Sequence, residues 1–271
     1  MSEMVVSSVR KGGFVTTAKH YGDSVSNYYE TGGGSVIGDS PVDWNGLIKA
    51  TGSSDSYSEK TLVFCIYPLE LSDDGNWYIF GAESGVILVG HWDADGGVWI
   101  GARTTSNAIK NANTQGDGLG DWAGMIPYEW NAIMISFQII SGERRVKIKS
   151  NGVEVYDDVW GTGDEENHPQ SHDGYVWGGR GDGFTGDPER GMECYVSYVW
   201  CDETYLDPDV YYDDFFDANF KPKDIGADGS AVTGGQPETY APDGDMTINL
   251  GTADNWDEVG TVPDAPISPT D

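Results

Sequence analysis

The segment from Trp130 to Asp157 constrains the fold more than any other part of the chain, because its apolar residues follow the two-residue period of a β-strand. Before the turn-forming pair Ser141-Gly142 and after it, apolar residues alternate with polar ones. The apolar set is Ile133, Ile135, Phe137, Ile139, Val146 and Ile148, and the polar set after the turn is Arg145, Lys147 and Lys149. This pattern predicts two half-buried strands.

The pair Asn151-Gly152 predicts a tight hairpin at the end of the second of these strands. A type I′ turn needs positive φ at both central residues, and Asn and Gly adopt this conformation at low cost. A two-residue loop then places Lys149 opposite Glu154 on the solvent side. It places Ile148 opposite Val155 on the core side.

Composition extends the β prediction to the rest of the chain. The 38 glycines, 10 tryptophans and 15 tyrosines suit many short strands joined by tight turns. Residues 61–67, TLVFCIY, are apolar at successive positions and predict a central strand buried on both faces. We expect one main domain with an appendage.

Several motifs resemble those of laminin-G-like, or concanavalin A-like, modules over roughly residues 28 to 210. The resemblance lies in a Trp that opens a strand, the Asn-Gly turn, and three later motifs. These are Gly178-Gly179, Phe184-Thr185-Gly186 and the exit Leu206-Asp207. The resemblance implies an all-β fold, a two-sheet antiparallel jelly-roll β-sandwich with an irregular C-terminal extension. It speaks to fold more than to function.

Three regions are predicted along the chain. Residues 1–25 form an N-terminal arm or a peripheral strand, residues 26–208 form the sandwich, and residues 209–271 form an acidic, Gly- and Pro-rich extension. The extension carries few apolar residues, so it either drapes over the sandwich or attaches to a partner. If it attaches, truncation after Asp209 is expected to leave a folded sandwich.

The extension also resembles the tail that follows such modules in tailed-bacteriophage structural proteins, on the segment FKPKDIGADGSAVTGG from Phe220 and on the closing residues. That resemblance implies a virion protein, such as a capsid decoration, a head fibre or a tail-associated subunit. Its partners would be other virion proteins and further copies of itself. Its location would be the virion, after synthesis in the host cytoplasm.

The charge balance narrows the classes of partner. The formal net charge is −30, with 45 acidic and 15 basic residues. The electrostatic field of so negative a chain repels nucleic acid and anionic membrane surfaces. We see no apolar stretch of the kind found in secretory signals or membrane spans, so no membrane insertion is expected.

The three cysteines, Cys65, Cys194 and Cys201, lack the spacing of a metal site. On one extended strand, Cys194 and Cys201 would lie about 23 Å apart, at roughly 3.3 Å per residue, and on opposite faces. We therefore expect no bridge between them.

No catalytic residues are predicted. Retaining glucanases of this fold need paired carboxylates about 5 Å apart, and no Glu-x-Asp-x-x-Glu run occurs. Glu193 stands alone on its strand. His168 and His172 have the spacing of a helical zinc pair, but Pro169 between them favours a loop. A polysaccharide-degrading enzyme is kept as an alternative to a non-enzymatic protein.

Carbohydrate binding is the functional alternative, because aromatic rings beside Asp and Asn side chains are suited to holding sugars. The residues predicted for such a site are Trp122, Trp160, Trp177, Asn111, Asn113 and Asp121. Aromatic residues also fill the core of any sandwich, so each Trp has a structural alternative. The glycan would be a host or environmental polysaccharide.

Calcium is the one cofactor that the sequence brings into consideration. Asp93, Asp95 and Asp117 lie in loops, and calcium takes six to eight oxygen ligands. Asp-Gly pairs also simply make turns. Two functions from different classes therefore remain: a virion structural protein that displays a lectin-like sandwich, and a carbohydrate-binding module or enzyme outside a virion.

Overall fold

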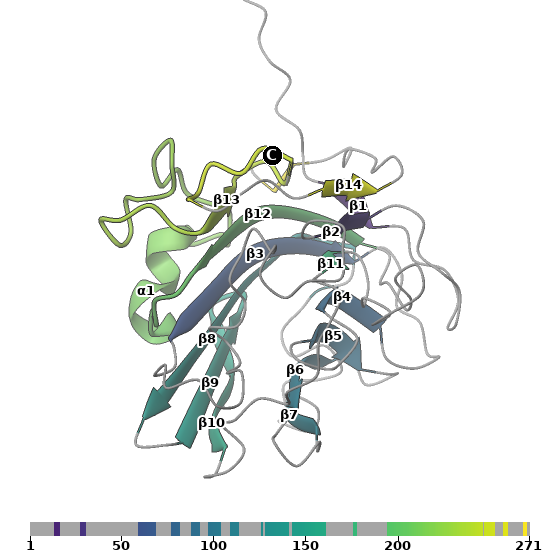
Figure 1. Ribbon diagram of the computed structural model, residues 1–271, viewed down its shortest axis with the longest axis vertical. Helices are drawn as coiled ribbons and strands as arrows, with labels where there is room; N and C mark the ends of the chain where they lie inside the picture. The colour runs from purple at the N-terminus through teal and green to yellow at the C-terminus, as the bar shows by residue number, and fades with distance from the viewer. Residues whose placement is uncertain are drawn as a thin grey trace, which may run out of the picture.

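A computed structural model of the chain is shown in Figure 1. Backbone and side chains are described for residues 59, 61–68, 126, 128–138, 145–159, 194–245, 247–252 and 268–269, and the backbone alone for the strands outside these ranges.

Two antiparallel sheets form the body of the protein. The first has the order β1-β12-β3-β8-β9-β10, with β13 also paired to β12, and the second has the order β14-β2-β11-β4-β5-β6-β7. The first sheet comprises β1 (Phe14–Thr16), β12 (Cys194–Asp202), β3 (Lys60–Pro68), β8 (Asn131–Ile140), β9 (Glu143–Ser150), β10 (Val153–Trp160) and β13 (Thr239–Ala241). The second comprises β14 (Asp257–Val259), β2 (Tyr28–Glu30), β11 (Val176–Trp177), β4 (Trp77–Gly81), β5 (Leu88–Trp92), β6 (Gly97–Arg103) and β7 (Ile109–Asn113).

The predicted all-β, two-sheet jelly-roll sandwich is therefore confirmed. The helix α1 (Pro208–Phe215) lies on one side of the first sheet, and the second sheet lies on the other side (Figure 1). We call the side beneath α1 the capped face and the opposite side the inner face.

The central strand predicted from residues 61–67 is also confirmed. β3 pairs with β12 on one edge and with β8 on the other, and residues 61–66 are all buried. Leu62, Phe64 and Ile66 alternate with Thr61, Val63 and Cys65, so both faces of the strand are covered. A strand that is covered on both faces reads as a continuous apolar run.

The prediction that β8 is half-buried is wrong. Ile133, Ile135 and Phe137 are buried on the inner face as expected, but Ala132 and Met134 on the capped face are buried as well. The cause is the chain after Leu206, whose side chains pack on Ala132 and Met134 in one cluster. The side-chain environment of Ile139 lies outside the described residues.

The hairpin between β9 and β10 turns at the predicted residues. Asn151 has φ 46° and Gly152 has φ 75°, which are the positive values that a type I′ turn requires. Lys149 lies opposite Glu154, as predicted. The prediction that Ile148 lies opposite Val155 is wrong, because a β-bulge after Glu154 makes Tyr156 the partner of Ile148. Val155 is nevertheless buried.

A second bulge, in β12, corrects the expected placement of the cysteines. The register against β3 shifts between Ser197 and Trp200, and Tyr198 has φ 54°. Cys194 lies opposite Pro68 and Cys201 lies opposite Leu62. These partners are an even number of residues apart on β3, so the two cysteines share a face instead of lying on opposite faces. All three cysteines are buried, and none of them forms a disulfide bond.

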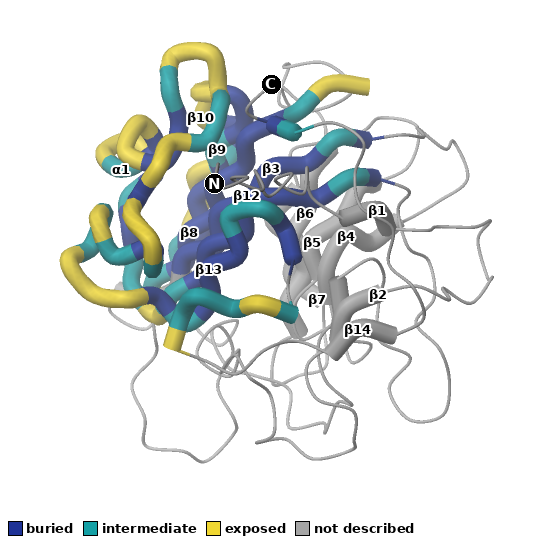
Figure 2. The backbone as a smooth tube through the Cα atoms, turned by 90° about the horizontal axis from the view of Figure 1, so that it is seen from above, coloured by how far each residue is buried: buried dark blue, intermediate teal, exposed yellow. Residues whose placement is uncertain are grey.

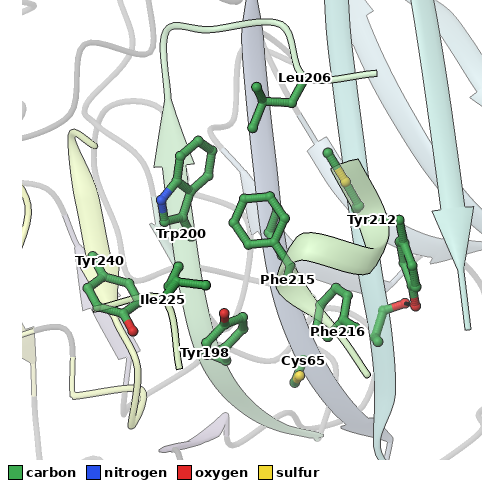
Figure 3. Close-up of a cluster of buried hydrophobic side chains, with 12 residues drawn as sticks. Cys65, Tyr198, Trp200, Leu206, Tyr212, Phe215, Phe216, Ile225 and Tyr240 are labelled. Carbon is green, nitrogen blue, oxygen red and sulfur yellow. Dashed lines mark hydrogen bonds between the residues drawn. The ribbon is translucent and has the colours of Figure 1, made fainter. Parts of the chain in front are cut away.

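Residues 208–252, here called the C-terminal cap, cover the capped face. Asp207 caps α1 by accepting a hydrogen bond from the backbone N–H of Asp209, and Pro208 begins the helix. Figure 3 shows the cluster of buried side chains that joins the cap to the sheet, and Figure 2 shows exposed segments on the turns around it. The cluster includes Tyr198, Trp200 and Leu206 below, and Tyr212, Phe215, Phe216, Ile225 and Tyr240 above.

Hydrogen bonds reinforce this packing. Trp200 Nε1 donates to the carbonyl of Gly229 at 3.2 Å, and the Tyr198 hydroxyl donates to the carbonyl of Lys223 at 2.8 Å. β13 extends the sheet along β12. The described residues of the predicted extension thus lie over the sandwich, and their burial reverses the expectation that truncation after Asp209 leaves a folded sandwich. The domain boundaries themselves stay a prediction.

Candidate functional site

The residues predicted for glycan binding fall mostly outside the described side chains. Asn111 and Asn113 are on β7, Trp160 ends β10, and Trp177 is on β11, but only the backbone of these strands is described. β7 and β10 are the last strands of their sheets and contact each other. Trp177 lies elsewhere, between β2 and β4. Trp122 and Asp121 lie outside the described residues, so the predicted site stays a prediction.

The same holds for the predicted calcium ligands. Asp93, Asp95 and Asp117 lie outside the described residues. Within the part of the chain that the structure describes, no group of three His, Cys, Asp or Glu side chains is placed to hold a metal ion. Among those residues, too, no helix combines the length and the apolar run that a membrane span requires.

Three aromatic rings from neighbouring strands meet on the capped face, beside the cap. Tyr67 on β3 stacks on Tyr195 of β12, with ring centroids 5.3 Å apart, and the two residues are register partners. Trp130, just before β8, meets Tyr67 edge to face at 5.7 Å and Tyr195 at 6.4 Å. All three rings are partly buried, and Trp130 packs against the cluster beneath the cap.

The segment that leads into β8 carries a further aromatic residue, Tyr128, whose backbone bonds to the end of β3. Tyr128 is 57% exposed and has φ 59°, a conformation that is a genuine outlier for a bulky residue. Its backbone N–H donates to the carbonyl of Pro68, next to Tyr67, at 3.1 Å. We call Tyr67, Tyr128, Trp130 and Tyr195 the aromatic surface.

The side chain of Asn131 closes the segment that carries Tyr128. Its Oδ1 accepts from the backbone N–H of Ile126 at 2.6 Å, and its Nδ2 donates to the carbonyls of Ile126 at 2.9 Å and Glu129 at 2.8 Å. These bonds bring both ends of the segment 126–131 onto one carboxamide. They hold the backbone of Tyr128 in its strained conformation, and strain of this kind concentrates at functional sites.

A cluster of charges joins the hairpin to the cap. Lys147 is buried, although the sequence pattern predicts an exposed position, because α1 begins above it. Its Nζ lies 3.1 Å from Asp207, 3.3 Å from Glu154, and in hydrogen-bond contact with Asp209. Next to it, Arg145 donates two hydrogen bonds to Asp157, at 2.7 and 2.6 Å.

These contacts shift the pKa values of Lys147, Asp209 and Asp157. Burial alone lowers the pKa of Lys147, but its hydrogen bonds to Asp209, Asp207 and Glu154 outweigh burial and raise that pKa. The hydrogen bond from Lys147 lowers the pKa of Asp209, and the one from Arg145 lowers the pKa of Asp157. The lysine stays charged and paired, so it fastens the cap to the sheet and does not serve as a general base or nucleophile.

Sequence reasoning did not identify the aromatic surface as a site. The sequence pattern places Tyr67 in a buried strand and Trp130 at the start of another, and both placements are compatible with the structure. Their meeting with Tyr195 depends on the register of three strands and on the bulge in β12, which no local pattern reports. The one local signal is the density of aromatic residues in Tyr128-Glu129-Trp130.

No protein-family model and no curated protein sequence matches the chain. Among solved structures, a native heptameric SAP-like pentraxin from Limulus polyphemus is similar, with 13% identity, a TM-score of 0.44, and coverage of 74% of this chain and 80% of the pentraxin. The CBM40 of Ruminococcus gnavus IT-sialidase gives 12% identity, a TM-score of 0.45, and coverage of 70% of this chain and 94% of the module.

The binding domain of botulinum neurotoxin serotype D gives 12% identity and a TM-score of 0.41. That match covers 58% of this chain, which spans 37% of the toxin chain. Likeness at this level carries no ligand or activity from one protein to another. The strand order and register define the chain as a two-sheet antiparallel jelly-roll β-sandwich.

Proposed function

We propose that the chain is a non-enzymatic glycan-binding module and that the aromatic surface is its binding site. The observation that carries this proposal is Tyr128, an exposed aromatic residue held at φ 59°, whose backbone bonds to Pro68 next to Tyr67 and which precedes Trp130 by two residues. A Tyr in this conformation costs stability, and nothing in its exposed environment repays that cost through burial. Selection for ligand contact explains why the ring stands there.

The chemistry of the surface fits a neutral sugar. Aromatic rings offer flat apolar faces to the C–H groups of a pyranose, and the Tyr hydroxyl offers a polar edge. The formal net charge of −30 repels polyanionic glycans. Neutral host or environmental polysaccharides are therefore the proposed ligands.

The test is affinity electrophoresis of the full chain through gels that contain xylan, hydroxyethylcellulose or galactomannan. Tyr128→Gly is the sharpest variant, because Gly adopts positive φ without strain and the backbone path is kept. We expect this variant to lose retention while its melting temperature stays equal or rises. Retention equal to that of the unmodified chain would remove Tyr128 from the site. Reducing-sugar release that disappears on Glu193→Gln would instead establish the enzymatic alternative.

We further propose that the module is displayed on a bacteriophage virion, as a capsid decoration, head fibre or tail-associated subunit. The support is the resemblance of the segment from Phe220 and of the closing residues to tails of phage structural proteins. Its partners would then be other virion proteins and further copies of the chain. Immunogold electron microscopy of particles from the source culture tests this. Label on heads or tails supports it, and label absent from all particles, with free protein in the lysate, rejects it.

A further inference from the structure

The turn between β9 and β10 folds back onto the first residues of β8. The backbone N–H of Asn151 donates to the carbonyl of Ala132 at 3.0 Å, and the Asn151 Oδ1 accepts from the N–H of Ala132 at 2.9 Å. The last regular pair of this ladder is Ser150 with Ile133. The side chain of Asn151 thus supplies the next acceptor of the ladder, after the backbone has already turned away.

The Nδ2 group of the same carboxamide contacts the segment that carries Tyr128. Asn151 Nδ2 donates to Asn131 Oδ1 at 2.8 Å, and that oxygen is also the acceptor for the N–H of Ile126. Asn151 therefore orients the Asn131 carboxamide, whose Nδ2 must face the carbonyls of Ile126 and Glu129. Both asparagines are buried, so each misdirected group would lose a hydrogen bond without water to replace it.

We infer that Asn151 is a positioning residue for the aromatic surface: through Asn131 it holds the segment 126–131 in the conformation that presents Tyr128 and Trp130 to a neutral glycan. The inference rests on the proposed function for its ligand. The positioning itself concerns only the bonds between two strand ends.

The C-terminal cap supports this arrangement from outside. The hydroxyl of Tyr212, on α1, donates to the carbonyl of Ala132 at 3.1 Å, the same carbonyl that accepts from Asn151. A Cβ added to Gly152 would lie 2.9 Å from the ring of Phe220. The cap thereby touches both the turn and the start of β8.

Asn151→Asp is the test variant, because it keeps the shape and the acceptor for Ala132 while replacing the Nδ2 donor with an oxygen that faces Asn131 Oδ1. The first readout is hydroxyl-radical footprinting of Tyr128 and Trp130 in the full chain, which needs no ligand. The second is retention by xylan, hydroxyethylcellulose and galactomannan. Asp157→Asn is the matched control, since it breaks the Arg145 ion pair on the same hairpin but lies outside the asparagine contacts.

We expect changed footprints at Tyr128 and Trp130 in Asn151→Asp alone, and a loss of retention of about tenfold, the effect of roughly one lost hydrogen bond of ordinary strength. Unchanged footprints, equal changes in Asp157→Asn, or changed footprints with full retention would each overturn the inference. If Asn151→Asp fails to fold, Asn151→Gly replaces it, with the same expected direction, because Gly keeps the positive φ of the turn and removes the carboxamide.

The two readouts separate the two proposals. A chain that no polysaccharide retains rejects the proposed function, and the footprints still decide whether Asn151 positions the segment. Retention that is lost in Tyr128→Gly but unaltered in Asn151→Asp upholds the proposed function and rejects the positioning role.

Discussion

The strands β8–β10 and the C-terminal cap both bury apolar side chains against the first sheet, but their sequences do so in different ways. On the inner face, β8 contributes buried apolar side chains at alternate positions, including Ile133 and Ile135. The cap contributes few apolar residues, among them Phe215 and Tyr240, separated by acidic and glycine-rich turns. Large aromatic rings bury about 150–250 Å² each, so a few of them can cover a sheet face without a regular pattern. A segment without periodicity can therefore still belong to a core.

Truncation after Asp209 is the strongest test of whether the cap belongs to the core. It removes Tyr212, Phe215, Phe216, Ile225 and Tyr240 from the capped face and leaves Tyr198 and Trp200 uncovered. Each aromatic lost from a core costs about 3–5 kcal/mol, and a whole domain has only about 5–15 kcal/mol. We expect an unfolded or aggregated product, measured by circular dichroism and size-exclusion chromatography. A soluble truncated chain with a cooperative melting transition would show that the cap is dispensable.

The variants Phe215→Ala and Phe64→Ala compare how much the cap and the inner face each contribute to the free energy of unfolding. Both rings are fully buried, Phe215 in the cap cluster and Phe64 on the inner face of β3. We expect each variant to lower the unfolding free energy by about 3–5 kcal/mol. Urea titration followed by tryptophan fluorescence gives both values. A loss below about 1 kcal/mol for Phe215→Ala alone would place the cap outside the cooperative core.

The hairpin could be predicted because its information is local. Period-two alternation gave the strands, and Asn151-Gly152 gave the turn and the pairing of Lys149 with Glu154. The bulge at Val155 could not be predicted, since an extra residue leaves no mark in the pattern. Lys147 looked exposed because alternation reports the character of a side chain, and its burial depends on α1, which arrives from sixty residues later in the chain.

The candidate site was harder to predict for the same reason. Tyr67, Trp130 and Tyr195 come from three strands, and they share a face only in the register that the structure shows. In an unbulged β12, Tyr195 and Trp200 would lie on opposite faces, because they are five residues apart. The bulge near Tyr198 places the ring of Tyr195 on the same face of the sheet as Trp200, which packs beneath the cap. Long-range pairing of this kind has no signal in a single sequence.

Gly152→Ala probes the point where the two regions touch. The new Cβ would need φ 75° and would lie 2.9 Å from the Phe220 ring. We expect a loss of about 1–2 kcal/mol from the left-handed backbone, with a further cost if the ring cannot move. Thermal melts of the single variants and of Gly152→Ala with Phe220→Ala separate the two costs. If the double variant recovers nothing beyond additivity, the cap and the turn are not coupled through this contact.

Acid should loosen the charged link between the regions by a smaller amount. The pKa of Asp209 is lowered by the hydrogen bond from Lys147, so its contribution is present above the unfolded value of 3.8 and is lost as pH falls through the folded value. Asp209 is about half exposed, at 47%, so solvent screening limits its contribution to at most about 1 kcal/mol. We therefore expect Asp209→Asn to lower the unfolding free energy slightly at neutral pH and to match the unmodified chain at pH values well below 3.8. Urea titrations of both proteins across that range measure the difference. If the difference in unfolding free energy between the two proteins instead grows on acidification, the ionised carboxylate of Asp209 opposes the docking of the cap. Lys147 would then be held by its other partners, Asp207 and Glu154.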